Sequence, residues 1–253
     1  MIESLKSIAF RSGRVTGALR ALRAASYWFD HSPHERDFSF LRHASIRPGL
    51  FLDLGANLGQ SATSALKIRP DFTALSLEPN RACEPGLRLT KWLLRGRMDF
   101  RMCGVGFEPG ELDFFVPRRS SRLLTEEGTF DLASLDTPAS VRRIGRRGVD
   151  YEVLRQRLPV VSVDSLEVNP VVVKLDLQGF ELAALKGMQR TLRSHRPVLL
   201  VEVGPDRPAI EAFLAAELYR GFAYDGRHLG DPLTLPMLNE IFLPEESVDS
   251  FVE

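Results

Sequence analysis

Residues 51–60, FLDLGANLGQ, constrain the fold more than any other stretch, because a short apolar run leads directly into a glycine-containing turn and then a helical pattern. Phe51, Leu52 and Leu54 are typical of a strand covered on both faces, and Asp53 is its single charge. In an open α/β sheet, such a turn lies where a nucleotide-like ligand binds, beside the first backbone N–H groups of the next helix. The stretch therefore predicts an α/β fold with a ligand crevice at this turn.

The spacing of the turn glycines distinguishes between classes of cofactor. A dinucleotide fold uses G-x-G-x-x-G, which lets a pyrophosphate approach the backbone, whereas Gly55 and Gly59 here are four positions apart around Asn57. The D-x-G-x-N-x-G pattern instead favours a cofactor with an amino-acid tail, such as S-adenosylmethionine (SAM). A turn with a purely structural role is the alternative.

The composition excludes several other classes of protein. The 253 residues, 44% of them hydrophobic, suffice for one substantial core. Thirty-three basic residues balance thirty-three acidic ones, so no overall charge indicates a nucleic-acid partner. Two cysteines do not make a disulfide framework and favour the cytoplasm. No apolar run approaches the roughly 20 residues of a membrane span, and no secretory signal is expected.

Residues 1–45 are predicted to form a helical extension before the main domain, residues 46–253. The first 30 residues or so read as a basic amphipathic helix, which would pack on the domain, pair with a second copy of the chain, contact an anionic membrane surface or cover the crevice. His31, His34 and His43 follow in a polar connector. Because no Asp, Glu or Cys spacing supports a metal site there, we expect these histidines to be solvated.

An acidic residue follows the second apolar run, Phe72–Leu77, about 20 residues beyond the glycine turn. This residue, Glu78, is placed to accept hydrogen bonds from ribose hydroxyls. The third strand, near residues 98–102, should end beside it, so Cys103 is either a wall residue of the pocket or an ordinary buried cysteine. The residues that we expect at the cofactor site are Asp53, Gly55, Asn57, Gly59, Gln60, Glu78, Pro79, Cys103 and Gly104.

Between about residues 108 and 170 the alternation of strands and helices is interrupted. This insertion is predicted to contain a strand at 111–116 and an apolar run at 158–166, and to lie over the carboxyl ends of the strands. It is rich in arginine, which indicates either a solvated loop or a lid that favours an anionic acceptor. Its arginines include Arg118, Arg119, Arg122, Arg142, Arg143, Arg146 and Arg147.

The stretch VVVKLDLQGFELAALKG, residues 171–187, is the second landmark. It predicts a buried strand ending at Asp176, and a helix over 180–192. Lys174 and Asp176 should share one face of the strand, so this lysine would pair with Asp176 or with Glu202 at the end of the next strand. A structural ion pair is the alternative. Asp53, Glu78, Asp176 and Glu202 all close apolar runs, which would gather four carboxylates at one edge of a parallel sheet.

Taken together, DLGANLGQ, Glu78-Pro79, VSVDSL and KLDLQGFELAALKG followed by VLLVEV resemble the FkbM-type SAM-dependent methyltransferases over about residues 50–245. The resemblance implies a Rossmann-like class I methyltransferase fold, with a seven-stranded, mostly parallel sheet, helices on both faces and the last strand antiparallel. It also implies O-methyl transfer to a hydroxyl of a sugar, glycolipid or polyketide-type natural product. Gln178 is a departure, since many members carry glutamate there.

The C-terminal segment agrees with this fold. A helix is expected at 210–217, a strand with a turn at 222–229 and a last strand at 239–243. Because a loop rather than a helix joins the last two strands, they should be antiparallel.

Methylation of an alcohol calls for a general base or for a metal that acidifies the hydroxyl. Asp176 is the leading candidate for the base, and Lys174 and Glu181 are expected to tune or orient it. Glu202 and His228 are reserve candidates. A divalent metal is compatible with the carboxylates, but no ligand spacing requires one, so no metal ligand is assigned.

Two other functions stay open from the sequence. A SAM-binding partner subunit without catalytic activity is one, and Gln178 is the feature that keeps it in view. The other is an NAD-dependent oxidoreductase, which would share the sheet and the ribose acid, although the glycine spacing disfavours it.

Overall fold

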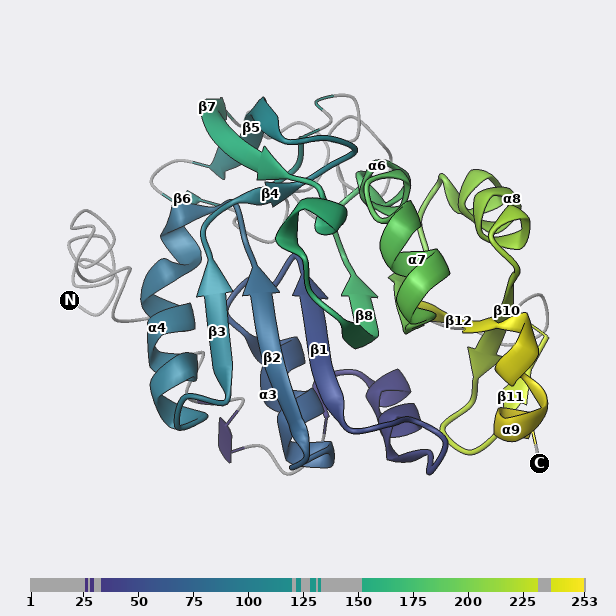
Figure 1. Ribbon diagram of the computed structural model, residues 1–253. Helices are drawn as coiled ribbons and strands as arrows, with labels where there is room; N and C mark the ends of the chain where they lie inside the picture. Colours follow the sequence, from purple (N-terminus) through teal and green to yellow (C-terminus); the bar gives the residue numbers. More distant parts are fainter. Residues whose placement is uncertain are drawn as a thin grey trace.

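The computed structural model of the protein describes residues 26, 28–29, 33–119, 122–123, 128–130, 132, 152–231 and 238–252. An eight-stranded sheet forms its centre, with the strand order β11-β10-β12-β9-β8-β1-β2-β3 (Figure 1). The predicted N-terminal amphipathic helix falls almost entirely outside the described residues, as do Arg142, Arg143, Arg146 and Arg147. Of the helices in the described ranges, none is both long and apolar enough to cross a bilayer.

Five neighbouring strands of the central sheet are parallel, so their carboxyl ends lie at one edge. They are β1 (Gly49–Leu54), β2 (Phe72–Leu77), β3 (Met98–Arg101), β8 (Pro170–Leu175) and β9 (Val198–Glu202). Asp53 of β1 is level with Ser76 of β2 on one side and with Lys174 of β8 on the other. This register places polar side chains of adjacent strands next to each other near the carboxyl edge.

Helices cover both faces of the central sheet. One face packs against η1 (Arg36–Arg42), α3 (Gln60–Ile68), α4 (Glu84–Leu93) and α9 (Asp249–Val252), with η2 (Arg81–Cys83) before α4 and η6 (Glu245–Ser247) before α9. The other face packs against η5 (Val163–Leu166), α6 (Glu181–Lys186), α7 (Gln189–His195) and α8 (Arg207–Ala216). Phe38 and Leu41 of η1 are fully buried in the first core, so the described part of the N-terminal extension packs on the domain.

The C-terminal strands confirm the predicted reversal of direction. β12 (Asn239–Pro244) inserts between β9 and β10 (Tyr219–Tyr224) and is antiparallel to both. The predicted strand at 222–229 is instead a hairpin of β10 with the two-residue β11 (Leu229–Gly230). Its turn contains Asp225, whose side chain accepts hydrogen bonds from the N–H groups of Arg227 and His228. This extra edge strand makes eight strands where seven were predicted.

The predicted insertion contains a second sheet, with the strand order β4-β7-β5-β6. Its strands are β4 (Gly104–Val105), β5 (Gly110–Arg119), β6 (Arg122–Leu123) and β7 (Glu152–Val161). Figure 1 shows this sheet beyond the carboxyl ends of the central strands. The Thr129 hydroxyl donates a 2.9 Å hydrogen bond to the carbonyl of Gln178, which joins the insertion to the loop after β8.

The helix predicted over 180–192 is wrong in one respect, because the chain forms two short helices, α6 and α7, with a break at Gly187. The Gly187 carbonyl accepts a hydrogen bond from the N–H of Asp164 instead of continuing the helix. A Cβ on Gly187 would lie 2.1 Å from the carbonyl oxygen of Gly106. Close packing of the 106–107 backbone therefore ends α6, although the apolar side chains keep their four-residue spacing across the break.

Candidate active site

The turn after β1 is held against the ends of both neighbouring strands. The N–H groups of Gly55 and Ala56 donate to the carbonyl of Leu77, and the N–H of Asp176 donates to the carbonyl of Leu54 at 3.0 Å. Gly55 has φ +86°, and a Cβ there would lie 1.8 Å from the carbonyl oxygen of Asp176. The adjacent protein backbone therefore requires the glycine at this position.

Gly59 has a similar structural reason. Its φ is +87°, and a Cβ would lie 2.8 Å from the methyl group of Thr90 in α4. The Thr90 hydroxyl in turn donates to the carbonyl of Leu58 at 2.8 Å. The turn is thereby attached to α4 as well as to β2 and β8.

Glu78 connects the glycine turn to the end of β2. Its carboxylate accepts the N–H of Asn57 at 2.8 Å and the N–H of Asn80 at 2.8 Å. Burial raises the pKa of Glu78 to about 7, although both backbone hydrogen bonds act to lower it. Each carboxylate oxygen keeps a second lone pair, so Glu78 can also accept from a ligand hydroxyl.

Two buried polar atoms near this turn make no hydrogen bond to any described residue: Nδ2 of Asn80 and Oδ1 of Asp53. The other Asp53 oxygen accepts from the Ser76 hydroxyl at 3.0 Å. Burial raises the pKa of Asp53 to about 6, against the opposing charge of Lys174. An unused amide donor beside the Glu78 carboxylate suits a nucleoside, which offers ribose hydroxyls as donors and ring nitrogens as acceptors. The residues present therefore fit the adenosine part of SAM.

The other predicted cofactor residues make contacts within the protein. Gln60 accepts the N–H of Leu58 at 3.2 Å, and Gly104 pairs with β7 and packs against Phe130. Pro79 is buried, as is Cys103, and burial raises the pKa of the Cys103 thiol to about 11, which keeps it neutral. Their contact with a cofactor stays a prediction.

Lys174 and Asp176 form the ion pair that strand alternation predicted. Lys174 Nζ donates to Asp176 Oδ2 at 2.9 Å, and the lysine side chain is 1% exposed. Burial opposes the charge of Lys174, but the carboxylates of Asp176, Glu35 and Asp53 raise its pKa. Burial likewise acts to raise the pKa of Asp176, and the charge of Lys174 with the hydrogen bonds of its neighbours lowers it. Both groups are therefore charged.

Gln178 joins the end of β8 to the end of β9. Its Nε2 donates to Asp176 Oδ1 at 2.9 Å and to Glu202 Oε2 at 3.0 Å. Gln178 has φ +53°, a left-handed conformation that an L-residue adopts at a cost. Burial and the negative charge of Asp176 raise the pKa of Glu202. The strained loop thus directs an amide group at two carboxyl groups.

Glu181 contacts the loop instead of the side chain of Asp176. Its carboxylate accepts the N–H of Leu177 at 2.7 Å and that of Gly179 at 3.1 Å, at the start of α6. Its predicted influence on Asp176 is thus exerted through the backbone that carries Gln178. Burial raises the pKa of Glu181.

The two reserve candidates for the base lie in different surroundings. Glu202 belongs to the carboxylate cluster, as described above. The His228 side chain is 82% exposed in the β10–β11 turn, beside Asp225, and β12 and β9 separate this hairpin from β8. The structure therefore does not bring His228 to Asp176.

Sequence reasoning missed the contribution of residues 34–37 to this site. His34 was expected to be solvated, but its side chain is 11% exposed, and its Nδ1 lies 3.0 Å from the Ser64 hydroxyl. Glu35 accepts from the Asn239 amide at 2.9 Å, and Asp37 accepts from the N–H of Asn239. These residues connect α3 to β12, and the charge of Glu35 acts on Lys174. No periodicity marks such a cover, although the acid-rich stretch HERD was a usable signal.

Among the described residues, no group of three or more His, Cys, Asp or Glu side chains is arranged to hold a metal ion. The carboxylates here are instead engaged by Lys174, Gln178, Ser76 and backbone N–H groups.

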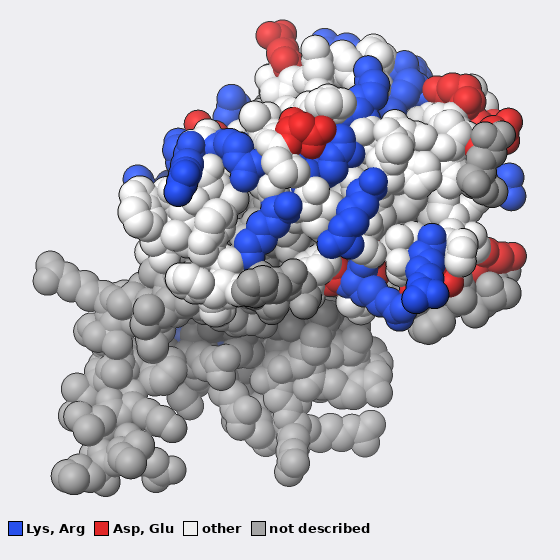
Figure 2. All heavy atoms as spheres, turned by 90° about the horizontal axis from the view of Figure 1, so that it is seen from below, with Lys and Arg blue, Asp and Glu red and all other residues white. Residues whose placement is uncertain are grey.

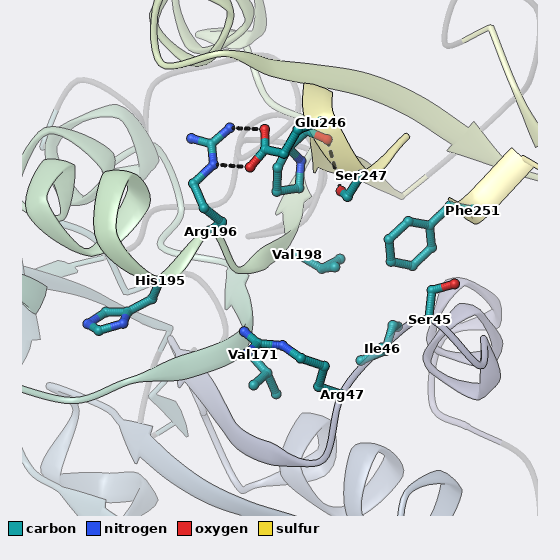
Figure 3. Close-up of a pocket in the computed structure, with 11 residues that line it drawn as sticks. Ser45, Ile46, Arg47, Val171, His195, Arg196, Val198, Glu246, Ser247 and Phe251 are labelled. Carbon is teal, nitrogen blue, oxygen red and sulfur yellow. Dashed lines mark hydrogen bonds and ion pairs between the residues drawn. The ribbon is translucent and has the colours of Figure 1, made fainter. Parts of the chain in front are cut away.

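A separate pocket lies at the opposite, amino edge of the sheet. It is lined by Val171 and Val198 at the starts of β8 and β9, and by Arg47, His195 and Arg196 (Figure 3). Ligands of open α/β sheets bind at the carboxyl ends of the strands, so this position does not suit the cofactor. The C-terminal residues Glu246, Ser247 and Phe251 also line this pocket.

The same amino edge carries many basic side chains. Seen from this side, lysine and arginine gather on the described surface (Figure 2). Several of these arginines are engaged by the protein itself: Arg69 donates to the carbonyls of Leu41 and Ile46, and Arg97 to that of Leu66 in α3. Such arginines satisfy main-chain carbonyls, including those at helix ends, and this structural role accounts for part of the basic surface.

Residues 53–224 match the methyltransferase FkbM domain family. The sequence matches no curated protein.

Solved structures with a similar fold include a methyltransferase FkbM from Methylobacillus flagellatus (17% identity, TM-score 0.49) and a precorrin-6y C5,15-methyltransferase from Geobacter metallireducens (10% identity, TM-score 0.43). The alignment with the first covers 81% of this chain and 47% of that one, so this chain spans about half its length. The alignment with the second covers 82% of this chain and 84% of that one.

Proposed function

This chain belongs to the FkbM methyltransferase family, and on that premise we propose that it transfers a methyl group from SAM to a hydroxyl of a sugar, glycolipid or polyketide-type acceptor. Family membership and the Rossmann-like fold support methyl transfer. The geometry of the carboxyl edge supports an oxygen nucleophile.

One observation carries the proposal: the candidate base lies directly against the candidate cofactor turn. The Asp176 main chain bonds to Leu54 and touches Gly55, so its side chain projects from the residue that borders the turn. The Asp176 side chain is 25% exposed, which leaves it accessible to an acceptor. A base so placed can meet a hydroxyl beside the bound cofactor.

The residues expected to hold SAM are Glu78 and Asn80, at the adenosine. The N–H groups of residues 55–59 already donate to groups of the protein, so they shape the turn and are not free to bind the ligand. When bound, SAM supplies a methyl group already activated by the sulfonium charge. Asp176 then has two tasks, to orient the acceptor hydroxyl and to accept its proton. Lys174 keeps Asp176 ionised for both.

An anionic acceptor stays a proposal. Three arginines of the insertion pair with acidic residues of the second sheet. Arg118 of β5 pairs with Glu152 of β7. Arg155 and Arg157 of β7 pair with Asp113 and Glu111 of β5 in the same way. These arginines stabilise the second sheet, so any preference for an anion would have to come from other arginines of the insertion.

The test is to incubate the protein with SAM and a panel of hydroxylated acceptors, and to detect the gain of one methyl group by mass spectrometry. Asp176→Asn should bind SAM with unchanged affinity in calorimetry and lose methylation by at least about 100-fold, the usual contribution of a general base. Near-full turnover in that variant would exclude Asp176 as the base.

The same experiment separates the alternatives. SAM binding without product from any acceptor would favour a cofactor-binding partner subunit, for which the glutamine at 178 is the motivating feature. Binding of NAD but not SAM would favour an oxidoreductase.

A further inference from the structure

Asp176 and Glu202 directly follow the paired residues Leu175 and Val201, so they lie next to each other at the ends of β8 and β9. Gln178 Nε2 donates to both, at 2.9 and 3.0 Å. Two ionised carboxylates repel each other, so two carboxyl groups that share one amide group favour a state with a single negative charge. The geometry therefore favours one acid and one carboxylate.

The surroundings decide which of the two carries the proton. Lys174 bonds to the second oxygen of Asp176 at 2.9 Å, so the negative charge is stabilised on Asp176. Glu202 faces Asp176 and is also under the negative charge of Glu181 from α6.

The neighbouring elements do not reverse this assignment. Asn239 of β12 is level with Glu202 and carries no charge. Glu35 from the segment before η1 and Asp53 of β1 both act on Lys174. Glu202 is thus the member that stays neutral.

We propose that Glu202 acts as a neutral carboxylic acid that donates a hydrogen bond to Asp176, and that this pair, held together by Gln178, receives the proton of the acceptor hydroxyl. The inference rests on the proposed methyl transfer to oxygen. Glu202 and Gln178 are positioning residues, and Asp176 is the group that meets the acceptor.

The proton step balances without a further reactant. The O–H bond of the acceptor breaks, its electron pair stays on the acceptor oxygen, and the proton bonds to a free lone pair of Asp176. The pair then holds two protons and releases one to water after the product leaves. No atom is oxidised or reduced.

The pair also explains how Asp176 can act as a base although it is bound to Lys174. A carboxylate bound to a buried lysine is a weak base, but an alcohol oxygen becomes strongly acidic as it gains a methyl group, so a weak base suffices if it is ionised and correctly placed. A neutral Glu202 removes one negative charge from beside Asp176, where Asp53 and Glu78 also contribute. Asp176 therefore remains ionised at neutral pH.

Infrared spectroscopy of the full-length protein tests the pair without any acceptor. At about pH 8, where Glu78 and Asp53 are mostly ionised, the wild-type protein should show a carbonyl band of a protonated carboxylic acid that is clearly weaker in Glu202→Gln. Asp176→Asn should keep the band but shift its titration midpoint to lower pH, because the neighbouring negative charge is lost. Glu217→Gln is the control, since Glu217 is a buried carboxylate away from the pair, and its hydrogen bond with Arg193 lowers its pKa. It should leave the band unchanged.

Kinetics provide the second measurement. Glu202→Gln and Gln178→Met should keep SAM affinity while the kcat falls at least about tenfold and its pH dependence changes. Glu217→Gln should keep both. A carbonyl band of equal intensity in Glu202→Gln and wild-type protein, with the variant folded by circular dichroism, would overturn the proposal. If the wild-type protein methylates no acceptor, the proposed function fails, and the infrared result still decides whether the pair exists.

Discussion

At the ends of the strands, several single residues carry a charge although they are buried. Lys174, Asp53 and Glu78 are almost completely buried, which is costly for charged groups unless each has a partner. Asp53 accepts a hydrogen bond from a hydroxyl, Glu78 accepts two from backbone N–H groups, and Lys174 donates one to a carboxylate. Each of these buried residues therefore depends on its partner.

Lys174→Met should destabilise the protein by about 3–5 kcal/mol, because it leaves the carboxylate of Asp176 without its cation. The double variant Lys174→Met/Asp176→Asn should recover part of that loss. Lys91→Met is the matched control, since Lys91 pairs with Asp99 at 2.7 Å on the surface, and it should cost less than about 1 kcal/mol. Urea denaturation measures all three, and equal losses in both lysine variants would contradict the buried ion pair.

SAM affinity should fall about tenfold from about pH 8 to about pH 6, because Glu78 accepts ligand hydroxyls best when ionised and its pKa is about 7. The stability of the free protein changes with pH in the opposite direction. Burial raises the pKa of Glu78 from 4.5 to about 7, so the contribution of Glu78 to stability is fully present below pH 4.5 and is lost as the pH rises through 7. Calorimetry at both pH values tests the prediction. In Glu78→Gln, binding should be weak and independent of pH, and an unchanged wild-type affinity would refute the ribose assignment.

At the scale of elements, the strand–turn–helix unit after β1 is positioned by contacts with segments distant in sequence. Its glycines permit positive φ, but their neighbours are the Asp176 carbonyl and the Thr90 side chain. The turn therefore connects the proposed cofactor site to Asp176, the proposed base.

Gly55→Ala should cost about 3 kcal/mol or more and abolish SAM binding, because it adds a backbone overlap to an unfavourable φ. Gly96→Ala separates these two effects. Gly96 also has positive φ, +77°, yet a Cβ there would meet nothing within 4 Å, so only about 1–2 kcal/mol is expected. Denaturation and calorimetry of both variants test this, and similar losses would mean that the approach to Asp176 is not tight.

Across the whole molecule, the two edges of the central sheet differ in role. The carboxyl edge gathers Asp53, Glu78, Asp176 and Glu202, beneath the second sheet (Figure 1). The amino edge gathers arginines that satisfy main-chain carbonyls (Figure 2). Binding and catalysis are thus expected at one edge, and cohesion at the other.

Arg196→Ala should lower stability by about 2 kcal/mol or more and leave SAM affinity within about twofold, because Arg196 lies in the pocket at the amino edge (Figure 3). It donates to the carbonyls of Glu217 and Leu218 at 2.9 and 2.8 Å and pairs with Glu246. Glu246→Gln weakens only the exposed ion pair and should cost less than about 1 kcal/mol. Thermal denaturation and calorimetry measure both effects. A loss of SAM affinity at full stability would mean that this pocket serves the reaction.

The pattern of residues was enough to predict the parallel sheet, its antiparallel strand near the end and the edge at which the acids meet. Apolar runs ending in Asp53, Glu78, Asp176 and Glu202 suffice for this, since the carboxyl ends of parallel strands lie together. Local alternation also predicted that Lys174 would accompany Asp176.

Which of these groups touch, and which are charged, depends on how distant segments pack together. Gln178 reaches Glu202, His34 reaches Ser64, and Gly106 interrupts the helix at Gly187, each through segments separated in the sequence. Protonation depends on burial and on the nearest charges, and neither quantity is a property of a short stretch of sequence. The pattern of strand ends is local and could be predicted, whereas the contacts between those ends arise only when the chain packs.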